Sequence, residues 1–284
     1  MITRLGVVGA GLMGSGIAEV SSRKGLSVVV VEASQAALER ARNRITKSID
    51  RGVRSGKLTA AERDAALARI AFETDLSAIA DSELVVEAVI EEESTKLELF
   101  RRIDEVVTDP NAILASNTSS IPIMKLGMAT KRPESVVGIH FFNPVPVMPL
   151  VELVTSLLTD PNTAGAANRF ATDQLGKHVI LSKDRAGFIV NALLIPYILS
   201  AIRMFESGFA TAEDIDTGMV DGCAHPMGPL ALADLIGLDT TMAVAESLYS
   251  EFKEPLYAPP PLLSRMCEAG LLGRKTSRGF YQYD

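Results

Sequence analysis

The chain has 284 residues, of which 47% are hydrophobic and 22% charged, so it is long enough to bury more than one core. Its formal net charge of −7 argues against nucleic acid as a partner, and no apolar run approaches the ~20 residues that span a membrane. The only two cysteines, Cys223 and Cys267, lack metal-binding spacing. We therefore expect neither disulfides nor a metal site, and a cytoplasmic location.

The first predicted strand and helix are joined by a glycine-rich turn with the spacing G-x-G-x-x-G. Gly9 permits the tight turn, Gly11 lets the backbone approach a pyrophosphate, and Gly14 lets the helix pack closely on the strand. This pattern predicts a dinucleotide loop whose phosphates lie at the helix N-terminus. The residues expected to contact the cofactor there are Gly9, Ala10, Gly11, Leu12, Met13 and Gly14.

The next predicted strand, residues 27–31, ends in an acidic residue. Glu32 lies 18 residues after Gly14, close to where a ribose-binding acid is expected in a dinucleotide-binding unit. The alternative is an ordinary strand–helix turn without a ligand. The combination of glycine spacing, helix, apolar strand and terminal acid favours the dinucleotide site.

Apolar runs separated by helical segments continue along the chain at residues 84–89, 112–116, 136–139, 150–154 and 179–181. Near-continuous apolar strands that alternate with helices predict a doubly wound, mostly parallel sheet with helices on both faces. In such sheets ligands bind beyond the carboxyl ends of the strands. The polar residues expected at that rim are Glu32, the region around Glu91, residues 117–119 and His140.

The pattern changes after residue 184. Residues 188–206 predict a long apolar helix, and further helices follow, interrupted by prolines between positions 226 and 261. We predict an α/β Rossmann domain over residues 1–184 and an all-helical domain over residues 185–284. The methionine- and leucine-rich faces of the second domain exceed what one small bundle needs, which suggests a homodimer formed through it.

One basic segment lies within the acidic chain. Between Arg40 and Lys57 there are seven basic residues and one acid. Helical spacing places Lys47, Arg51 and Arg54 on one face. A solvated helix face is one interpretation, and a binding site for a polyanionic ligand is the other.

His140 is the histidine best placed for chemistry, because it ends a predicted strand at the ligand rim. Glu152 lies in the next predicted strand between Val151 and Leu153, where a carboxylate is costly unless it is paired. If the two strands are neighbours, Glu152 accepts a hydrogen bond from one imidazole nitrogen. The other nitrogen then faces substrate, as general acid–base catalysis requires. A solvent-facing Glu152 is the alternative.

Several blocks of the chain resemble those of a known family, the short-chain L-3-hydroxyacyl-CoA dehydrogenases, in particular the stand-alone bacterial 3-hydroxybutyryl-CoA dehydrogenases. The resemblance covers essentially the whole chain. The blocks that carry it, besides the glycine loop, are residues 116–120 (SNTSS), 138–144 (GIHFFNP), 187–191 (GFIVN), 226–229 (PMGP) and 273–281 (GRKTSRGFY).

The resemblance implies the interconversion of a short-chain (3S)-3-hydroxyacyl-CoA, 3-hydroxybutyryl-CoA, and a 3-oxoacyl-CoA, acetoacetyl-CoA, with NAD as the cofactor. His140 would be the general base, and Glu152 would orient its imidazole. Ser119 and Asn191 would hydrogen-bond the 3-oxygen or the thioester, which makes residues 185–284 a substrate-binding domain as well as a dimerisation domain.

The resemblance also implies the binding residues. The further cofactor contacts expected are Glu32, Glu91, Lys96, Asn117, Asn143 and Lys275. The basic segment becomes a coenzyme A site, with Ser48, Arg51, Arg54 and Lys57, although Gly52 and Gly56 blur the register at Lys57. Ser119 would also contact the substrate. Glu32 should repel a 2′-phosphate, which favours NAD and leaves NADP as the alternative.

Two features depart from the family pattern: residues 223–225 and the prolines at 259–261. The first is expected near the substrate-binding side, where it would affect the acyl-chain preference. Two other functions remain open. One is a gulonate-dehydrogenase-like oxidoreductase of a free hydroxy acid, which would use the histidine–glutamate pair but not the basic helix. The other is a non-enzymatic protein of this fold.

Overall fold

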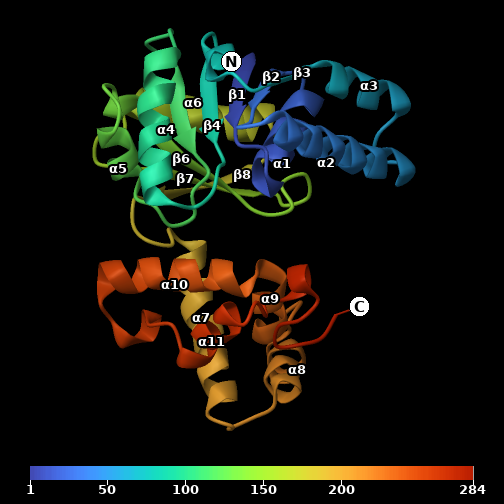
Figure 1. The fold of residues 1–284 in the computed structure, drawn as a ribbon, viewed down its shortest axis with the longest axis vertical. Coiled ribbons are helices and arrows are strands. Elements are labelled where there is room, and N and C mark those ends of the chain that lie inside the picture. Colours follow the sequence, from blue (N-terminus) through green and yellow to red (C-terminus); the bar gives the residue numbers. More distant parts are fainter. Residues whose placement is uncertain (284) are drawn as a thin grey trace. The chain divides into compact units, whose positions relative to one another are not determined.

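The computed structural model describes residues 1–283 and divides into two compact units, Met1–Asp184 and Arg185–Asp284 (Figure 1). The first is an α/β unit built on one sheet, and the second is helical. The fold class predicted from the sequence is therefore confirmed. Within the described residues no helix combines the length and apolar character needed to cross a bilayer.

The sheet has eight strands in the order β3-β2-β1-β4-β5-β6-β7-β8. The first six strands in sequence are mutually parallel, β7 is antiparallel to β6, and β8 is parallel to β7. The order reverses between β1 and β4, which is where open α/β sheets bind dinucleotides. The strands are β1 Arg4–Val8, β2 Ser27–Val31, β3 Ile70–Glu73, β4 Leu84–Glu87, β5 Ile113–Ser116, β6 Val136–Phe141, β7 Leu150–Thr155 and β8 His178–Lys183.

Helices cover both faces of this sheet. On one face α1, α2, α3 and α6 contribute to a core with the apolar side chains of β1, β2 and β6. On the other face α5 packs close to the sheet, since a Cβ on Gly138 would lie 2.9 Å from Ile123 Cδ1. The helices are α1 Leu12–Arg23, α2 Gln35–Arg54, α3 Ala60–Ala68, α4 Glu93–Val106, α5 Ile123–Met128 and α6 Pro161–Arg169, with short turns η1 Leu76–Ile79, η2 Pro133–Ser135 and η3 Phe170–Gln174.

The single reversal of strand direction follows from a short connection. Eight residues, Phe142 to Pro149, join β6 to β7, and three of them are proline. A parallel crossover needs a dozen or more residues, so this connection returns the chain antiparallel. Lys177 fixes the loop by donating from Nζ to the carbonyl oxygens of Val145 (2.6 Å) and Met148 (2.7 Å).

The antiparallel pairing also extends β6 beyond its predicted end. His140 pairs with Glu152 and Phe141 with Val151 in the β6–β7 ladder. The predicted strand ended at residue 139, two residues too early, because β7 supplies hydrogen-bonding partners up to Phe141. By contrast β4 ends at Glu87, earlier than predicted, because its neighbour β1 ends at Val8.

The second unit is an all-helical bundle with its own apolar core, formed largely by α7 and α10 with smaller contributions from α8, α9 and α11. Its long first helix begins at Val190, two residues later than predicted, after positive φ angles at Gly187 and Phe188. Its elements are α7 Val190–Glu206, α8 Ala212–Cys223, α9 Pro229–Ile236, α10 Leu238–Phe252, α11 Pro261–Glu268 and the short turns η4 Pro255–Tyr257 and η5 Arg274–Thr276.

Candidate active site

The three glycines of the loop differ in the space around them: a side chain would clash at Gly9 and at Gly14, but not at Gly11. A Cβ on Gly14 would lie 1.9 Å from the Gly9 carbonyl oxygen, and Gly9 has φ +83° with a would-be Cβ 2.7 Å from Val89. At Gly11 a Cβ would meet no atom within 4 Å. Gly9 and Gly14 are therefore required by the fold, whereas Gly11 leaves space at the N-terminus of α1. This geometry fits a pyrophosphate approaching the helix end.

Glu32 reaches the same loop from the end of β2. Its Oε1 accepts a hydrogen bond from the Ala10 backbone N–H at 2.6 Å. Because an ionised carboxylate has about four acceptor positions, this contact leaves capacity for ribose hydroxyls. The sequence-predicted acid and the sequence-predicted loop therefore lie together.

A buried charge cluster lies at the carboxyl end of β4. Lys96 is 1% exposed, and its Nζ contacts Glu87 Oε1 at 2.5 Å and Glu91 Oε2 at 3.2 Å. Glu87 is fully buried and also accepts from Ser116 Oγ at 2.6 Å. Lys96 and Glu91 were predicted from the family resemblance, but Glu87 was missed. An acid at the end of an apolar strand, as at Glu32, was the signal that could have found it.

Glu91 fixes the loop after β5. Its Oε1 accepts hydrogen bonds from Thr118 Oγ1, from Ser119 N at 2.9 Å, and from both N (3.1 Å) and Oγ (3.0 Å) of Ser120. Burial opposes ionisation of Glu91, but the Lys96 ammonium and these hydrogen bonds outweigh it. The pKa of Glu91 therefore lies below its usual value. The carboxylate thus holds the backbone of Ser119, the predicted substrate contact.

Two asparagines predicted to contact the cofactor lie close to β6. Asn117 Oδ1 accepts from the backbone N–H of Phe141 at 2.9 Å, which joins the end of β5 to the end of β6. Asn143 is exposed and follows β6 by two residues. Both lie at the carboxyl rim, as expected.

His140 and Glu152 form the hydrogen bond expected from the strand pattern. His140 Nδ1 lies 2.8 Å from Glu152 Oε2, with the histidine side chain 9% exposed and the glutamate side chain fully buried. A carboxylate only accepts, so Nδ1 is the donor and the proton of the neutral ring is fixed there. The Phe142 ring contacts the imidazole, with centroids 4.7 Å apart. The arrangement can orient a proton-transferring imidazole.

The basic segment lies mainly on α2. Ser48 is half-buried, and Arg51 and Arg54 are exposed in the last two turns of the helix. Lys57 lies beyond the helix end, past Gly56 with φ +71°, and its backbone N–H donates to Gly52 O. The four predicted coenzyme A contacts thus come from one helix and the turn that follows it.

The remaining two predicted residues belong to the second unit. Asn191 is half-buried in the first turn of α7. Lys275 lies in η5, where its Nζ contacts both carboxylate oxygens of Asp239, at 2.5 Å for Oδ1.

Comparison with known proteins identifies the family. A model of the 3-hydroxyacyl-CoA dehydrogenase NAD-binding domain matches residues 4–185, and one of the C-terminal domain of the same enzymes matches residues 187–283. The chain belongs to the 3-hydroxyacyl-CoA dehydrogenase family. The expected reaction class and the expected NAD cofactor are thereby confirmed.

Related proteins of this family match over the full length. The chain is 60% identical to a 3-hydroxybutyryl-CoA dehydrogenase of Mycobacterium tuberculosis, covering 99% of each chain. It superimposes on the crystal structure of FadB2 from M. tuberculosis with a TM-score of 0.98 and 59% identity, covering 100% of this chain and 99% of the other. For the (S)-3-hydroxybutyryl-CoA dehydrogenase PaaH1 of Ralstonia eutropha the TM-score is 0.94 at 46% identity, with full coverage of both.

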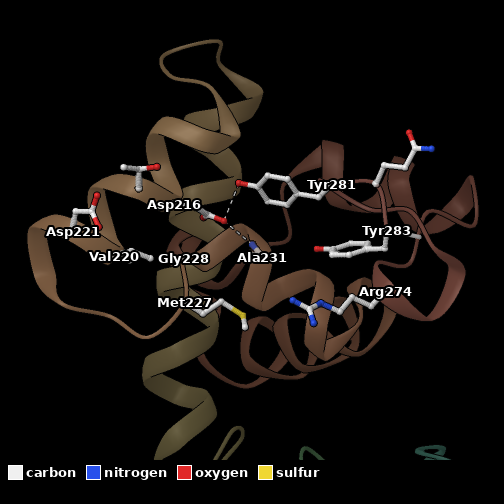
Figure 2. A pocket seen from close by; sticks show the side chains of 11 residues that line it. Asp216, Val220, Asp221, Met227, Gly228, Ala231, Arg274, Tyr281 and Tyr283 are labelled. Atoms are coloured by element: carbon white, nitrogen blue, oxygen red, sulfur yellow. Dashed lines mark hydrogen bonds between the residues drawn. The ribbon is translucent and has the colours of Figure 1, made fainter.

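Two blocks that carried the 3-hydroxyacyl-CoA dehydrogenase resemblance meet inside the helical unit (Figure 2). Asp216 on α8 accepts from the backbone N–H groups of Leu230 and Ala231, both at 2.8 Å, and from Tyr281 Oη at 3.0 Å. It therefore joins the start of α9 to the C-terminal block. Asp216, Ala231 and Tyr281 line a pocket of about 490 Å³.

A second buried acid holds the same C-terminal block. Asp234 accepts from the backbone N–H groups of Phe280 (3.0 Å) and Tyr281 (2.9 Å) and from Tyr283 Oη (3.0 Å). Burial, reinforced by the hydrogen bond to Asp234, raises the pKa of Tyr283 to about 12. The hydroxyl therefore stays protonated and donates a hydrogen bond to the Asp234 carboxylate. The GFY block thus has a structural role that sequence reasoning did not assign.

Substitution of the loop glycines separates folding from binding. Gly11→Ala should leave the thermal stability close to that of the wild type, since its methyl group meets open space, but should weaken NADH binding by about tenfold or more by excluding the pyrophosphate. Gly14→Ala should be unstable, because its methyl group would overlap the Gly9 carbonyl. Thermal melting and NADH titration measure both effects. Wild-type NADH affinity in a folded Gly11→Ala variant would contradict this assignment of the loop.

Proposed function

We propose that this protein is an NAD-dependent dehydrogenase that interconverts short-chain (3S)-3-hydroxyacyl-CoA and 3-oxoacyl-CoA, with 3-hydroxybutyryl-CoA and acetoacetyl-CoA as its substrate pair. The observation that carries the proposal is the buried His140–Glu152 hydrogen bond on the strand rim of an NAD-binding domain. The short acyl chain is supported by the names of two full-length relatives, both 3-hydroxybutyryl-CoA dehydrogenases.

The proton is handled by His140. Bound NAD⁺ supplies the hydride acceptor for C3 of the hydroxyacyl substrate. As the hydride leaves, His140 takes the proton of the 3-hydroxyl at Nε2, because Nδ1–H is committed to Glu152. Glu152 holds the ring in one tautomer and stabilises the imidazolium that forms. In the reverse direction the same imidazolium returns the proton to the oxygen.

Ser119 and Asn191 are assigned hydrogen bonds to the 3-oxygen or the thioester carbonyl. For Ser119 the support is the fixed position of its backbone, since Glu91 binds the N–H groups of Ser119 and Ser120. The assignment of Asn191 rests on its place in the GFIVN block of the family.

The cofactor is assigned to the glycine loop and the rim acids. Glu32 accepts the ribose hydroxyls and repels a 2′-phosphate, which makes NAD the preferred dinucleotide. The cluster of Glu87, Glu91 and Lys96 fixes the backbone at Ser119 and Ser120, which we assign to the nicotinamide end of the bound cofactor. The residues proposed to contact the cofactor are Gly9, Ala10, Gly11, Leu12, Met13, Gly14, Glu32, Glu91, Lys96, Asn117, Asn143 and Lys275.

The α2 face and the turn after it are assigned to the coenzyme A phosphates. Ser48, Arg51, Arg54 and Lys57 would supply one hydroxyl and three cations within a chain of net charge −7. Guanidinium groups suit this role because they bind phosphate oxygens in pairs.

A homodimer through the helical unit and a cytoplasmic location complete the proposal. The helical unit exposes large apolar side chains on several elements, which supports an interface there. The most exposed are Leu193, Phe209, Leu235 and Leu256. The cytoplasmic location rests on the cysteine usage.

The test of the activity follows the absorbance of reduced nicotinamide as the purified protein meets acetoacetyl-CoA, with NADH and NADPH compared. We expect fast oxidation of NADH and a kcat/KM at least tenfold lower with NADPH, because Glu32 faces the site of the 2′-phosphate. Turnover with NADPH alone would contradict the role of Glu32. Absence of turnover with both cofactors, in protein that binds NADH, would contradict the proposed substrate.

Charge reversal on α2 tests the coenzyme A site. Arg51→Glu with Arg54→Glu should raise KM for acetoacetyl-CoA by about tenfold or more, since each lost charge-assisted hydrogen bond costs about 1.5–3 kcal/mol. Activity with acetoacetyl-pantetheine, which lacks the nucleotide phosphates, should not change.

The matched control for this experiment is the reversal of two exposed arginines on α4, Arg101→Glu with Arg102→Glu. It changes the net charge equally and should leave both KM values unaltered. An unchanged KM for acetoacetyl-CoA in the α2 variant would remove α2 from the coenzyme A site. An equal rise of KM for acetoacetyl-CoA in the α4 control would show that the change in net charge alone causes the effect.

A further inference from the structure

An arginine from the middle of α2 reaches across to the dinucleotide loop. Arg44 Nη1 donates to the Ala10 carbonyl oxygen at 2.9 Å and contacts Ser15 Oγ at 3.4 Å. Ser15, buried in α1, donates from its own Oγ to the same carbonyl at 2.7 Å. The Ala10 carbonyl thus receives two hydrogen bonds from two different helices. The family roles assigned above do not include Arg44.

These contacts fix the direction of the next backbone N–H. The peptide bond is planar and trans, so the carbonyl of Ala10 and the N–H of Gly11 point in opposite directions. With the carbonyl held toward α2 and Ser15, the Gly11 N–H is directed away from them. Gly11 is also the position at which a Cβ would meet open space.

Ala10 is held from its other side as well. Its N–H donates to Glu32 Oε1 at 2.6 Å. The acid and the arginine therefore hold the two peptide groups of one residue, the acid taking the N–H and the arginine binding the carbonyl. Loss of Glu32 would remove the side-chain partner of the Ala10 N–H, and loss of Arg44 would leave the Ala10 carbonyl with Ser15 Oγ alone, so either loss loosens one peptide plane.

We propose that Arg44 is a positioning residue for the cofactor pyrophosphate, acting through the Ala10 carbonyl to aim the Gly11 N–H at the phosphate oxygens. Preorganisation of a backbone donor lowers the entropic cost of binding an anion. The proposal requires only that the loop binds NAD, and not the identity of the acyl substrate. Its failure is therefore distinguishable from failure of the proposed activity.

The test measures NADH affinity by the fluorescence change of the bound nicotinamide in three variants. Arg44→Gln removes the charged donor, Arg44→Lys keeps the charge but loses the planar fork, and Arg42→Gln is the matched control. Arg42 lies two residues away on α2, but its guanidinium is stacked 4.4 Å from the centroid of the Phe72 ring rather than on the loop. The control therefore removes the same charge from the same helix without touching Ala10.

We expect Arg44→Gln to raise the Kd for NADH by about three- to tenfold, with Arg44→Lys between it and the wild type, since the lost bond is charged but partly exposed to solvent. The Kd of ADP-ribose, which contains the pyrophosphate but no nicotinamide, should rise by the same factor. The melting temperature, and kcat at saturating NADH, should stay at wild-type values.

Three results would overturn the proposal. An unchanged Kd for NADH in Arg44→Gln would show that the Gly11 N–H is oriented for the pyrophosphate without this arginine. An equal rise in Arg42→Gln would show that only the charge of α2 matters. A rise for NADH without a rise for ADP-ribose would place the effect away from the pyrophosphate.

Discussion

One antiparallel strand pair sets the geometry of the proposed proton-transfer pair. The eight residues between β6 and β7 are too few for a crossover, so β7 runs against β6 and brings Glu152 directly opposite His140. The two side chains then lie on the same face as cross-strand neighbours, 2.8 Å apart and away from solvent. A parallel β7 would leave Glu152 as a buried acid without this partner, which is costly. The histidine therefore depends on the strand direction for its orientation.

Carboxylates perform a similar task along the rest of the rim. Glu32 accepts a hydrogen bond from the N–H of Ala10, and Glu91 accepts hydrogen bonds from the N–H groups of Ser119 and Ser120. Glu87 forms an ion pair with the buried Lys96, which also pairs with Glu91. Each acid comes from the end of a strand or the turn after it. Because parallel strands bring their carboxyl ends to one edge, acids far apart in the sequence organise one continuous surface. The carboxylates thereby fix the backbone on either side of the N–H groups that they bind.

The sequence predicted those parts of the fold that depend on local spacing. Glycine spacing identified the loop, apolar runs identified the sheet, and a lone acid among apolar residues identified Glu152 as the partner of His140. It did not predict Glu87, because the predicted strand ran to residue 89 and so placed this acid inside the strand, whereas β4 ends at Glu87. The contact of Arg44 with Ala10 joins residues 34 positions apart. Helical periodicity cannot show such a contact, and the same holds for Asp216 and Asp234, whose partners lie in other elements of the bundle.

The most direct test of the strand-pair mechanism is a double-mutant cycle on kcat with acetoacetyl-CoA and saturating NADH, using His140→Asn, Glu152→Gln and the double variant. If Glu152 acts only through the imidazole, the double variant should be no slower than His140→Asn alone, because removing the histidine removes the function of its partner. NADH affinity in each variant checks that the fold is intact. Losses that multiply in the double variant would show that the two residues act independently, and would contradict the role of the β6–β7 register as the basis of the active site.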